Sequence, residues 1–465
     1  MVFSSIPFLY YFLPCTLLLY FAAPRRLKNA VLLLASVVFY AWGEPKFVVV
    51  MLLTILQGYV FGILTEKSGG RRAKVYLAVS AVISLGLLGY CKYADFFIRN
   101  FNAVTGLSLP LLKVTLPIGI SFYTFQILSY VADVSRGNVR AQRSFIDLAA
   151  YVAMFPQLIA GPIVRYSDIA GQLSDREHSF AGSALGVRRF VLGLGKKVLI
   201  ANTLGELAGL CRDSGDKSVL LFWLYGVSCT LQIYFDFSGY SDMAIGLGKI
   251  FGFDFPENFN YPYISKSITE FWRRWHMSLG SWFRDYVYIP LGGNRVKKPR
   301  WLCNLLIVWF LTGFWHGAEW NFIVWGLFFG VLLIVEKLVL AKVLDRTGIL
   351  KYIYVMLAVT LSFVVFDAAG ISEAWFCIRA MFGGGGFPAV SREGLYYLKS
   401  FGPLLITAVI GATPLVSLGI RRMRENGKAA RVLNCMEPVV LLLLMLVITG
   451  YIVDGSFNPF LYFRF

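Results

Sequence analysis

Charged residues are scarce in this sequence. Only 15% of its 465 residues are Asp, Glu, Lys or Arg, whereas 57% are hydrophobic. Soluble globular chains average about 45–50% apolar residues, and many runs here exceed the ~18 apolar residues that indicate a membrane helix. The composition therefore excludes a soluble globular protein and predicts an all-α membrane protein that crosses the bilayer many times.

The patterns of disulfide-bonded and metal-binding proteins are also missing. Seven cysteines are an odd number, they form no C-x-x-C pair, and several lie in apolar runs, so neither a disulfide framework nor a metal site is predicted. The first apolar run, 1–24, lacks a basic start, and its positive charges follow it at Arg25, Arg26 and Lys28. That order favours a retained span with its N-terminus outside the cell over a cleaved signal peptide.

The net charge of +18 would suggest nucleic acid in a soluble protein. Here the basic residues lie mostly between apolar runs, as the positive-inside rule requires of a protein in the cell membrane, so no nucleic-acid partner is expected. The basic clusters, of which 421–431 is the strongest, are predicted to be cytoplasmic. The C-terminal tail, 455–465, is then predicted to lie outside, at the membrane interface.

The apolar runs predict about 10–13 membrane helices in a single domain, 1–465, without a soluble domain. The predicted spans are 5–24, 29–43, 46–64, 74–91, 114–134, 146–165, 219–236, 302–319, 321–342, 351–368, 402–420 and 436–453. The stretch 188–210 is apolar but carries Lys196 and Lys197 in its middle, which predicts a short interfacial or re-entrant helix. Its lysines could contact either anionic lipid or an acidic acyl donor.

A polar set lies at the end of one predicted span. Gln232, Asp236 and Tyr240 are four residues apart and share one face of a helix. Such a face usually points into the protein or into a wet cavity. The set either lines a substrate path or forms a buried polar network between helices, and for Asp236 we favour the structural role.

A second helix is expected after the proline-bounded stretch 256–262, with Thr269 as its cap. It would be amphipathic, with an aromatic stripe that suits the lipid interface and a neighbouring stripe that carries Arg273 and His276. The members of the aromatic stripe are Trp272, Trp275, Leu279, Trp282 and Tyr286.

Only three histidines occur. His178 lies in a polar stretch and is interpreted as an ordinary loop residue, and His276 lies among Arg and Trp residues. His316 ends an apolar run between Trp315 and Gly317, where an ionisable side chain is costly unless it functions. A neutral imidazole at such a site can remove a proton from a hydroxyl that attacks a thioester or ester.

Several long motifs resemble the membrane-bound O-acyltransferase (MBOAT) family, and within it the alginate O-acetyltransferase-like branch. The central ones are YFDFSGYSDMAIGLGKIFGFDFPENFNYPYIS at 234–265, ITEFWRRWHMSLGSWFRDYVYIPLGGNR at 268–295 and LTGFWHGAEWNFIVWG at 311–326. Further similar segments lie at 1–14, 32–42, 116–134 and 154–166, so the resemblance runs nearly end to end.

The resemblance implies that His316 is the catalytic histidine and that His276 occupies the second polar catalytic position. It implies a funnel and tunnel through the bilayer, with an acyl donor on the cytoplasmic side, either acetyl-CoA or an acyl-carrier protein, and no permanently bound cofactor or metal. It also implies a separate extracytoplasmic SGNH-type acetyltransferase that completes the O-acetylation of an exopolysaccharide or cell-wall polymer.

Three alternatives stay open. A close relative within the family transfers D-alanyl groups from a carrier protein to teichoic acids, and the stretch FDFSGYSDMAIG does not separate the two activities. A transporter or flippase for a polysaccharide precursor would use the polar residues as a path, but no internal repeat of the kind common in transporters is evident. A purely structural assembly subunit would not require a buried histidine.

Overall fold

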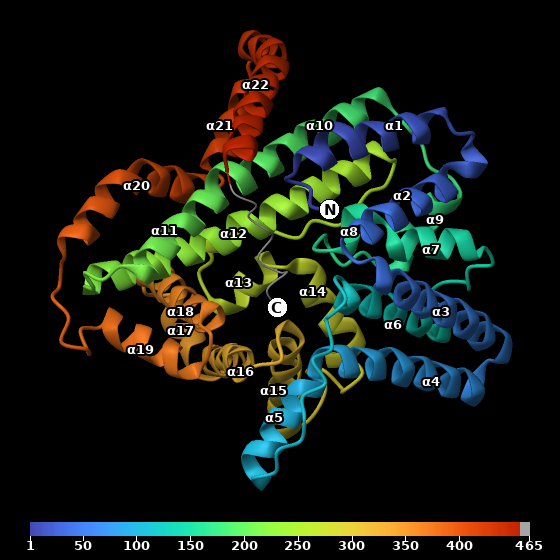
Figure 1. Cartoon of the computed structure of the whole chain (residues 1–465), viewed down its shortest axis with the longest axis horizontal. Helices are drawn as coiled ribbons and strands as arrows, with labels where there is room; N and C mark the ends of the chain where they lie inside the picture. The colour runs from blue at the N-terminus through green and yellow to red at the C-terminus, as the bar shows by residue number, and fades with distance from the viewer. Residues whose placement is uncertain (456–465) are drawn as a thin grey trace. The chain divides into compact units, whose positions relative to one another are not determined.

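The computed structural model of the chain describes residues 1–455, and this part is built from helices without a strand (Figure 1). The prediction of an all-α class is confirmed. The chain divides into two compact units. The first comprises Met1–Phe190 with Ser241–Pro256, and the second comprises Val191–Tyr240 with Glu257–Phe465.

The first unit contains the helices of the N-terminal part of the chain and the end of α12 (Val219–Ile250). They are η1 (Pro7–Phe12), α1 (Leu13–Ala22), η2 (Arg25–Leu27), α2 (Lys28–Gly43), η3 (Pro45–Phe47), α3 (Val48–Ser68), α4 (Gly70–Leu88), η4 (Gly89–Tyr93), α5 (Ala94–Thr105), α6 (Ile120–Arg136), α7 (Phe145–Ala153), α8 (Phe155–Leu158), α9 (Tyr166–Ser174) and the first part of α10 (Phe180–Gly195).

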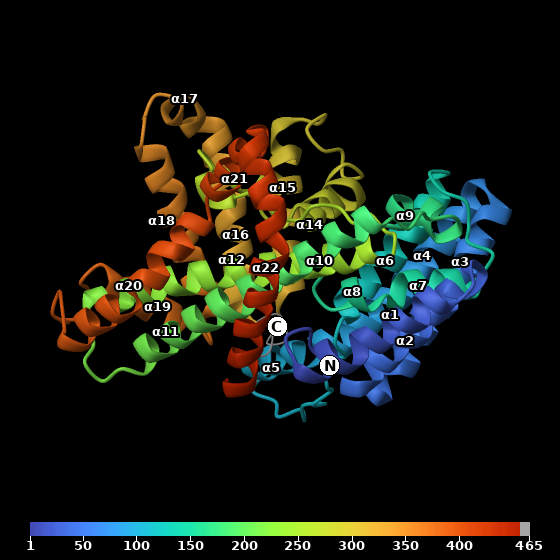
Figure 2. The same cartoon turned by 90° about the horizontal axis from the view of Figure 1, so that it is seen from above.

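Small residues and aromatic rings bring the helices of this unit together. Helices α3, α4 and α6 pack side by side (Figure 1). A Cβ atom built on Gly58 of α3 would lie 2.5 Å from the Ile127 side chain of α6, so these helices approach more closely than a larger residue permits. Helices α1 and α2 also lie side by side (Figure 2), and the ring of Phe12, the last residue of η1, lies 5.6 Å from that of Phe39 in α2.

The second unit contains the remaining helices. They are η5 (Lys196–Ala201), α11 (Asn202–Asp213), most of α12 (Val219–Ile250), η6 (Pro262–Ile264), α13 (Ile268–Arg274), α14 (Met277–Phe283), η7 (Arg284–Tyr288), α15 (Lys298–His316), α16 (Trp320–Val335), η8 (Glu336–Leu340), α17 (Ala341–Leu344), α18 (Leu350–Asp367), α19 (Ile371–Met381), α20 (Arg392–Gly411), α21 (Leu415–Glu425) and α22 (Gly427–Asp454).

Seven helices in the described part are long and apolar enough to cross a membrane. They are Pro45–Ser68, Gly70–Thr105, Val219–Ile250, Trp320–Leu344, Leu350–Asp367, Arg392–Gly411 and Gly427–Asp454. The span at Val219–Ile250 has the largest buried share of its apolar window, 67%, whereas that of Gly427–Asp454 is 6% buried. Thus α12 has the most buried apolar window of the seven helices, and α22 buries almost none of its window, as a lipid-facing helix does.

Several predicted elements differ from the structure. The predicted span 146–165 is instead two short helices, α7 and α8, because Pro156 has no N–H to continue the hydrogen-bond ladder of α7 and its ring would clash with the preceding turn. The stretch 188–210 is not a short helix but part of a helical segment that runs from Phe180 to Asp213. From residue 456 onward, the predicted interfacial tail lies outside the described residues.

Candidate active site

His316 is the last residue of α15, which packs against α16 in a helical hairpin (Figure 1). A Cβ atom built on Gly313 would lie 2.3 Å from the carbonyl oxygen of Phe322, and one built on Gly326 would lie 2.3 Å from that of Trp309. The two backbones are therefore in direct contact, which only glycine allows at both positions. This contact fixes the end of α15, and with it His316, against the first turns of α16.

Aromatic rings surround the imidazole of His316, a residue that is only 6% exposed. The ring of Trp325, on α16, lies 5.1 Å from it at an angle of 84°, and the ring of Phe366, on α18, lies 5.3 Å from it at 82°. Edge-to-face contacts of this kind are the preferred geometry between aromatic rings. His316 is thus buried and held in orientation by two helices, as a catalytic imidazole requires.

His276 lies between two helices and not within one. The predicted continuous helix is wrong, because α13 ends at Arg274 and α14 begins at Met277. His276 has φ 44° and ψ 53°, in the left-handed region that residues other than glycine rarely adopt. Such a conformation persists only where the surrounding structure holds it, and it is concentrated at functional sites.

The structure that holds His276 is the irregular segment after α12. The side-chain oxygen of Asn258 lies 3.0 Å from Nδ1 of His276 and accepts hydrogen bonds from the Ser278 hydroxyl at 2.9 Å and backbone N–H at 3.3 Å. Asn258 is fully buried. Sequence reasoning missed this residue, although its place in the stretch PENFNYPY, between two prolines and beside the histidine-bearing motif, was an available signal.

One indole ring contacts both candidate histidines. The Trp315 ring lies 4.9 Å from the His316 ring and 6.3 Å from the His276 ring. Trp315 is itself 4% exposed. The structure therefore brings together the two histidines and the tryptophan that the sequence singles out, in one buried cluster of the second unit.

Burial also sets the protonation state of His276, which lies outside the seven spans. It lowers the pKa of this imidazole from its ordinary value of 6.5 to about 3, because a charged imidazolium would lose its hydration. His276 is therefore neutral near pH 7, and a neutral imidazole has one nitrogen free to accept a proton or hydrogen bond.

Asp236 forms a buried ion pair. Its carboxylate lies 2.5 Å from the ammonium of Lys197, and both side chains are at most 5% exposed. Helices α10 and α12 approach closely at Gly193 and Gly239, because a Cβ atom at Gly239 would lie 2.7 Å from the carbonyl oxygen of Gly193. The predicted lipid contact is wrong for Lys197, which is buried and faces the protein interior. Tyr240, one turn further along α12, is likewise buried.

The two stripes predicted for 269–286 do not form. Because the helix breaks at His276, exposed Arg273 and buried His276 do not share a face. The cap is Ser267, which accepts a hydrogen bond from the Glu270 N–H, and not Thr269. The aromatic stripe is wrong as a lipid anchor, since Trp275 and Trp282 are each 5% exposed. These rings pack in the protein core.

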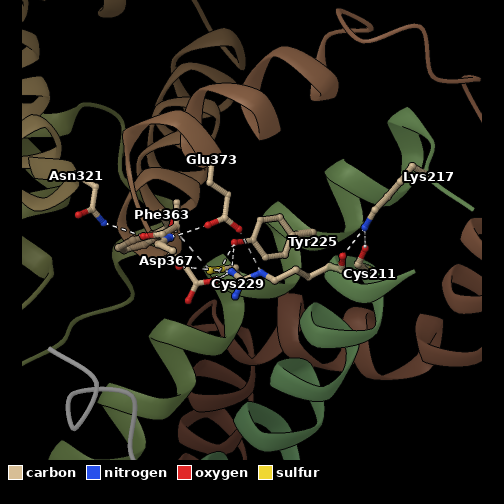
Figure 3. A network of polar contacts seen from close by, with 11 residues as sticks. Cys211, Lys217, Tyr225, Cys229, Asn321, Phe363, Asp367 and Glu373 are labelled. Carbon is tan, nitrogen blue, oxygen red and sulfur yellow. Dashed lines mark hydrogen bonds and ion pairs between the residues drawn. The ribbon is translucent and has the colours of Figure 1, made fainter. Parts of the chain in front are cut away.

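A polar network holds the end of α18 (Figure 3). Arg212 pairs with Asp367, and the Tyr225 hydroxyl donates to the same carboxylate at 2.8 Å. On the other side of this helix end, the Asn321 amide donates to the carbonyl oxygen of Ala368 at 2.9 Å. The network fixes the helix turn that carries Phe366 against His316. Sequence reasoning did not find it, because its members are far apart in the chain.

His178 belongs to the first unit and takes part in a structural network. The Tyr20 hydroxyl donates to the carbonyl oxygen of Phe251 at 2.7 Å, and it lies 2.9 Å from Nε2 of His178 and 2.8 Å from Nε of Arg176. Burial, and then the charges of Lys28 and Arg176, lower the pKa of His178. The residue lies in a connection, as predicted, but it is bonded to α1.

The chain is similar to several known proteins. The family model of the membrane-bound O-acyltransferase family matches residues 110–347. The chain is 40% identical to the probable alginate O-acetylase AlgI of Azotobacter vinelandii, over 100% of both chains. It is 34% identical to the peptidoglycan O-acetyltransferase of Helicobacter pylori, over 86% of this chain and 83% of the relative.

A third relative has a different activity. The teichoic acid D-alanyltransferase of Bacillus subtilis is 33% identical over 46% of this chain and 58% of its own. The family match includes His276, His316 and the Asn258 segment, which form the buried cluster described above. The family of this chain is shown by its likeness to the Azotobacter vinelandii relative over the full length and by the family match over half of the chain. This protein belongs to the membrane-bound O-acyltransferase family and is an acyltransferase.

Proposed function

We propose that the protein transfers an acetyl group from a cytoplasmic thioester donor for the O-acetylation of an exopolysaccharide or cell-wall polymer. The likeness to a probable alginate O-acetylase and to a peptidoglycan O-acetyltransferase supports this substrate class. The single observation that carries the proposal is the buried cluster of His316, Trp315 and His276 within the part of the chain that matches the family.

His316 is the general base in this proposal. Its imidazole removes the proton of an acceptor hydroxyl as the hydroxyl oxygen attacks the thioester carbonyl carbon. The new C–O bond forms, the C–S bond breaks, and the imidazolium returns the proton to the departing thiolate. Burial among Trp325 and Phe366 excludes water, which would otherwise compete as the nucleophile.

His276 is the second polar residue of the site. It contacts the same indole as His316 and presents a neutral imidazole, so it can orient a substrate by accepting a hydrogen bond. Asp236 and Tyr240 serve a structural role, since the carboxylate is engaged by Lys197 inside the protein. Arg273 is exposed and is assigned no contact with the reacting groups.

The charge distribution supports an orientation. With the basic clusters in the cytoplasm, both termini are extracytoplasmic and His316 lies towards the outer half of the cell membrane. Acetyl-CoA and an acyl-carrier protein both suit a cytoplasmic donor. The partner we propose is a separate extracytoplasmic SGNH-type acetyltransferase, which would complete the transfer to the polysaccharide.

D-alanyl transfer to teichoic acid is the second candidate, because a D-alanyltransferase is among the relatives. That likeness covers 46% of this chain, whereas the likeness to the alginate O-acetylase covers all of it. Membranes that contain the protein should therefore take acetyl from labelled acetyl-CoA and leave D-alanine on a carrier protein untouched. The reverse preference would replace acetyl transfer with D-alanyl transfer.

The proposed base is tested by His316→Gln, with His178→Gln as the matched control. Both variants remove one of the three histidines, but only the first removes the proposed base. We expect ester formation on the polymer to fall by roughly 10²–10⁴-fold in His316→Gln, with normal abundance in the membrane, while His178→Gln stays near wild type. Unchanged acetylation in His316→Gln would overturn the proposal.

A further inference from the structure

The hydrogen bonds around Asn258 determine which atom of its amide faces His276. The backbone N–H of Ser278 can only donate, and it points at the same side-chain atom that lies 3.0 Å from Nδ1 of His276. That atom must therefore be the amide oxygen, which is an acceptor. The Ser278 hydroxyl, at 2.9 Å, donates to the same oxygen.

The tautomer of His276 follows from the amide oxygen of Asn258, which can only accept hydrogen bonds. Nδ1 must carry a hydrogen and donate it to Asn258, since two acceptors at 3.0 Å would repel each other. Burial keeps the imidazole neutral near pH 7, and a neutral imidazole carries only one N–H. Nε2 is therefore left with a lone pair and no hydrogen.

Nε2 of His276 is buried, and residues 1–455 supply no hydrogen-bond partner for it. Two rings face the imidazole, Phe237 from α12 at 4.6 Å and Trp315 from α15 at 6.3 Å. Buried polar atoms are nearly always paired, so an unpaired acceptor in a candidate active site indicates a ligand group that donates to it.

The backbone around His276 is held from both sides by the same segment. The N–H of Met277 donates to the carbonyl oxygen of Asn258 at 3.0 Å, and the N–H of Asn260 donates to that of Arg274 at 2.9 Å. These two bonds bracket His276 and maintain its left-handed conformation, φ 44°. The segment 258–260 therefore fixes both the position of the imidazole and its proton.

We propose that Asn258 is a positioning residue for the acyl transfer, which holds His276 as the Nδ1–H tautomer so that Nε2 accepts a hydrogen bond from a substrate N–H or O–H group. In this state His276 cannot donate to the oxyanion of the tetrahedral intermediate, so it orients a substrate instead. The inference rests on the proposed function, in which His276 faces the substrates.

The tautomer can be measured directly, because the chain has only three histidines. In protein labelled with ¹⁵N-histidine, we expect His276 to show a protonated Nδ1 and a bare Nε2. His178 serves as an internal reference for the opposite tautomer, since the Tyr20 hydroxyl gives its hydrogen to Phe251 and must accept one from Nε2–H of His178. His276→Gln assigns the signals, and a protonated Nε2 at His276 would overturn the inference.

Substitutions of Asn258 test its effect on activity. Asn258→Asp keeps the acceptor but adds a negative charge beside Nδ1, which favours the imidazolium. The neighbouring side chains do not offset this charge: Phe237 and Trp315 are uncharged, Arg273 is exposed and Arg274 is paired with Glu270. We expect Asn258→Asp to be active near pH 8.5. As the pH falls, its activity should be half lost at a pH roughly one unit or more above that at which wild type loses half of its activity.

The apolar variant Asn258→Leu should lose activity by about ten-fold or more at every pH, with a raised KM. A rise in KM for acetyl-CoA alone assigns the Nε2 contact to an amide N–H of the donor, and a rise for the acceptor alone assigns it to the acceptor's hydroxyl. Asn260→Ala is the matched control, because the exposed Asn260 takes part only through its backbone.

Equal losses in Asn258→Asp and Asn258→Leu without a shift of the pH profile would mean that Asn258 only supports the fold, and the inference would fail. Full activity in Asn258→Leu would also overturn it. The His316→Gln variant, measured in the same membranes, reports on the proposed function separately, since it does not depend on the tautomer of His276.

Discussion

The amide oxygen of Asn258 lies 3.0 Å from Nδ1 of His276, and this pair connects a loop that sequence reasoning overlooked to a histidine that it selected. The contact explains why a buried histidine can adopt a strained backbone conformation. It also gives the site a fixed acceptor at Nε2. His276→Ala removes that acceptor, and we expect acetyl transfer to fall by about ten-fold or more while the protein remains in the membrane. Loss of the protein from the membrane would instead assign His276 to folding.

The pKa of His276 predicts a pH dependence of stability. Burial lowers this pKa from 6.5 to about 3, so between these values the unfolded chain binds a proton that the folded protein does not bind. Stability due to this group is therefore complete above about pH 6.5 and falls as the pH decreases towards 3. The melting temperature of the purified protein should drop less between about pH 7 and 5 in His276→Gln than in wild type. An identical drop in both would contradict the burial of a neutral imidazole.

The Lys197–Asp236 ion pair predicts a difference between single and double substitutions. Lys197→Met or Asp236→Leu alone breaks this buried ion pair and should destabilise the protein by roughly 3–5 kcal/mol. The double variant, Lys197→Met with Asp236→Leu, has no unpaired charge and should recover most of the stability and the acetyl transfer. Thermal unfolding and ester content measure the two effects. Recovery of stability without activity would place Asp236 on the substrate path and contradict its structural role.

The contact between α15 and α16 predicts that Gly313→Ala is harmful. The new methyl group would meet the carbonyl oxygen of Phe322, a backbone atom that cannot move aside. The helices must separate and His316 must shift, and overpacking of this kind typically costs about 1–3 kcal/mol. Gly402→Ala in α20 is the control, because the added atom there meets nothing within 4 Å. Activity should fall in the first variant and persist in the second, and equal effects would refute the close packing.

The network at the end of α18 predicts a milder effect at a distance. Asp367→Asn removes the ion pair with Arg212 and loosens the turn that carries Phe366, which lies against His316. Because Arg212 is 38% exposed, the pair is partly screened by solvent, so we expect a loss of only a few-fold in kcat with little change in abundance. A loss as large as that of His316→Gln would show that Asp367 has a direct role in the reaction.

Much of the architecture could be predicted from the sequence, because runs of apolar residues and the position of basic clusters report directly on membrane helices. α15 ends at His316, close to the end of the predicted span 302–319. The break at His276 could not be predicted. The periodicity of Trp272, Trp275 and Leu279 fits one continuous helix, and only the tertiary bonds from the 258–260 segment stabilise a left-handed residue there.

The placement of charges shows a second limit of the sequence. Adjacent Lys196 and Lys197 predict a surface position, yet Lys197 is buried because Asp236 lies opposite it on another helix. Local patterns do not reveal a partner that is far away in the chain. The same reason hid Asn258 and Asp367, whose importance comes from what they contact and not from their own surroundings in the sequence.

The central claim is that His316 is the base of an acetyl transfer. The most direct measurement is the transfer of labelled acetyl groups from acetyl-CoA to the polymer in membranes that contain the extracytoplasmic partner and wild type, His178→Gln or His316→Gln at matched abundance. Wild type and His178→Gln should transfer label at similar rates, and His316→Gln should be slower by roughly 10²–10⁴-fold. Transfer by His316→Gln at the wild-type rate would contradict the account.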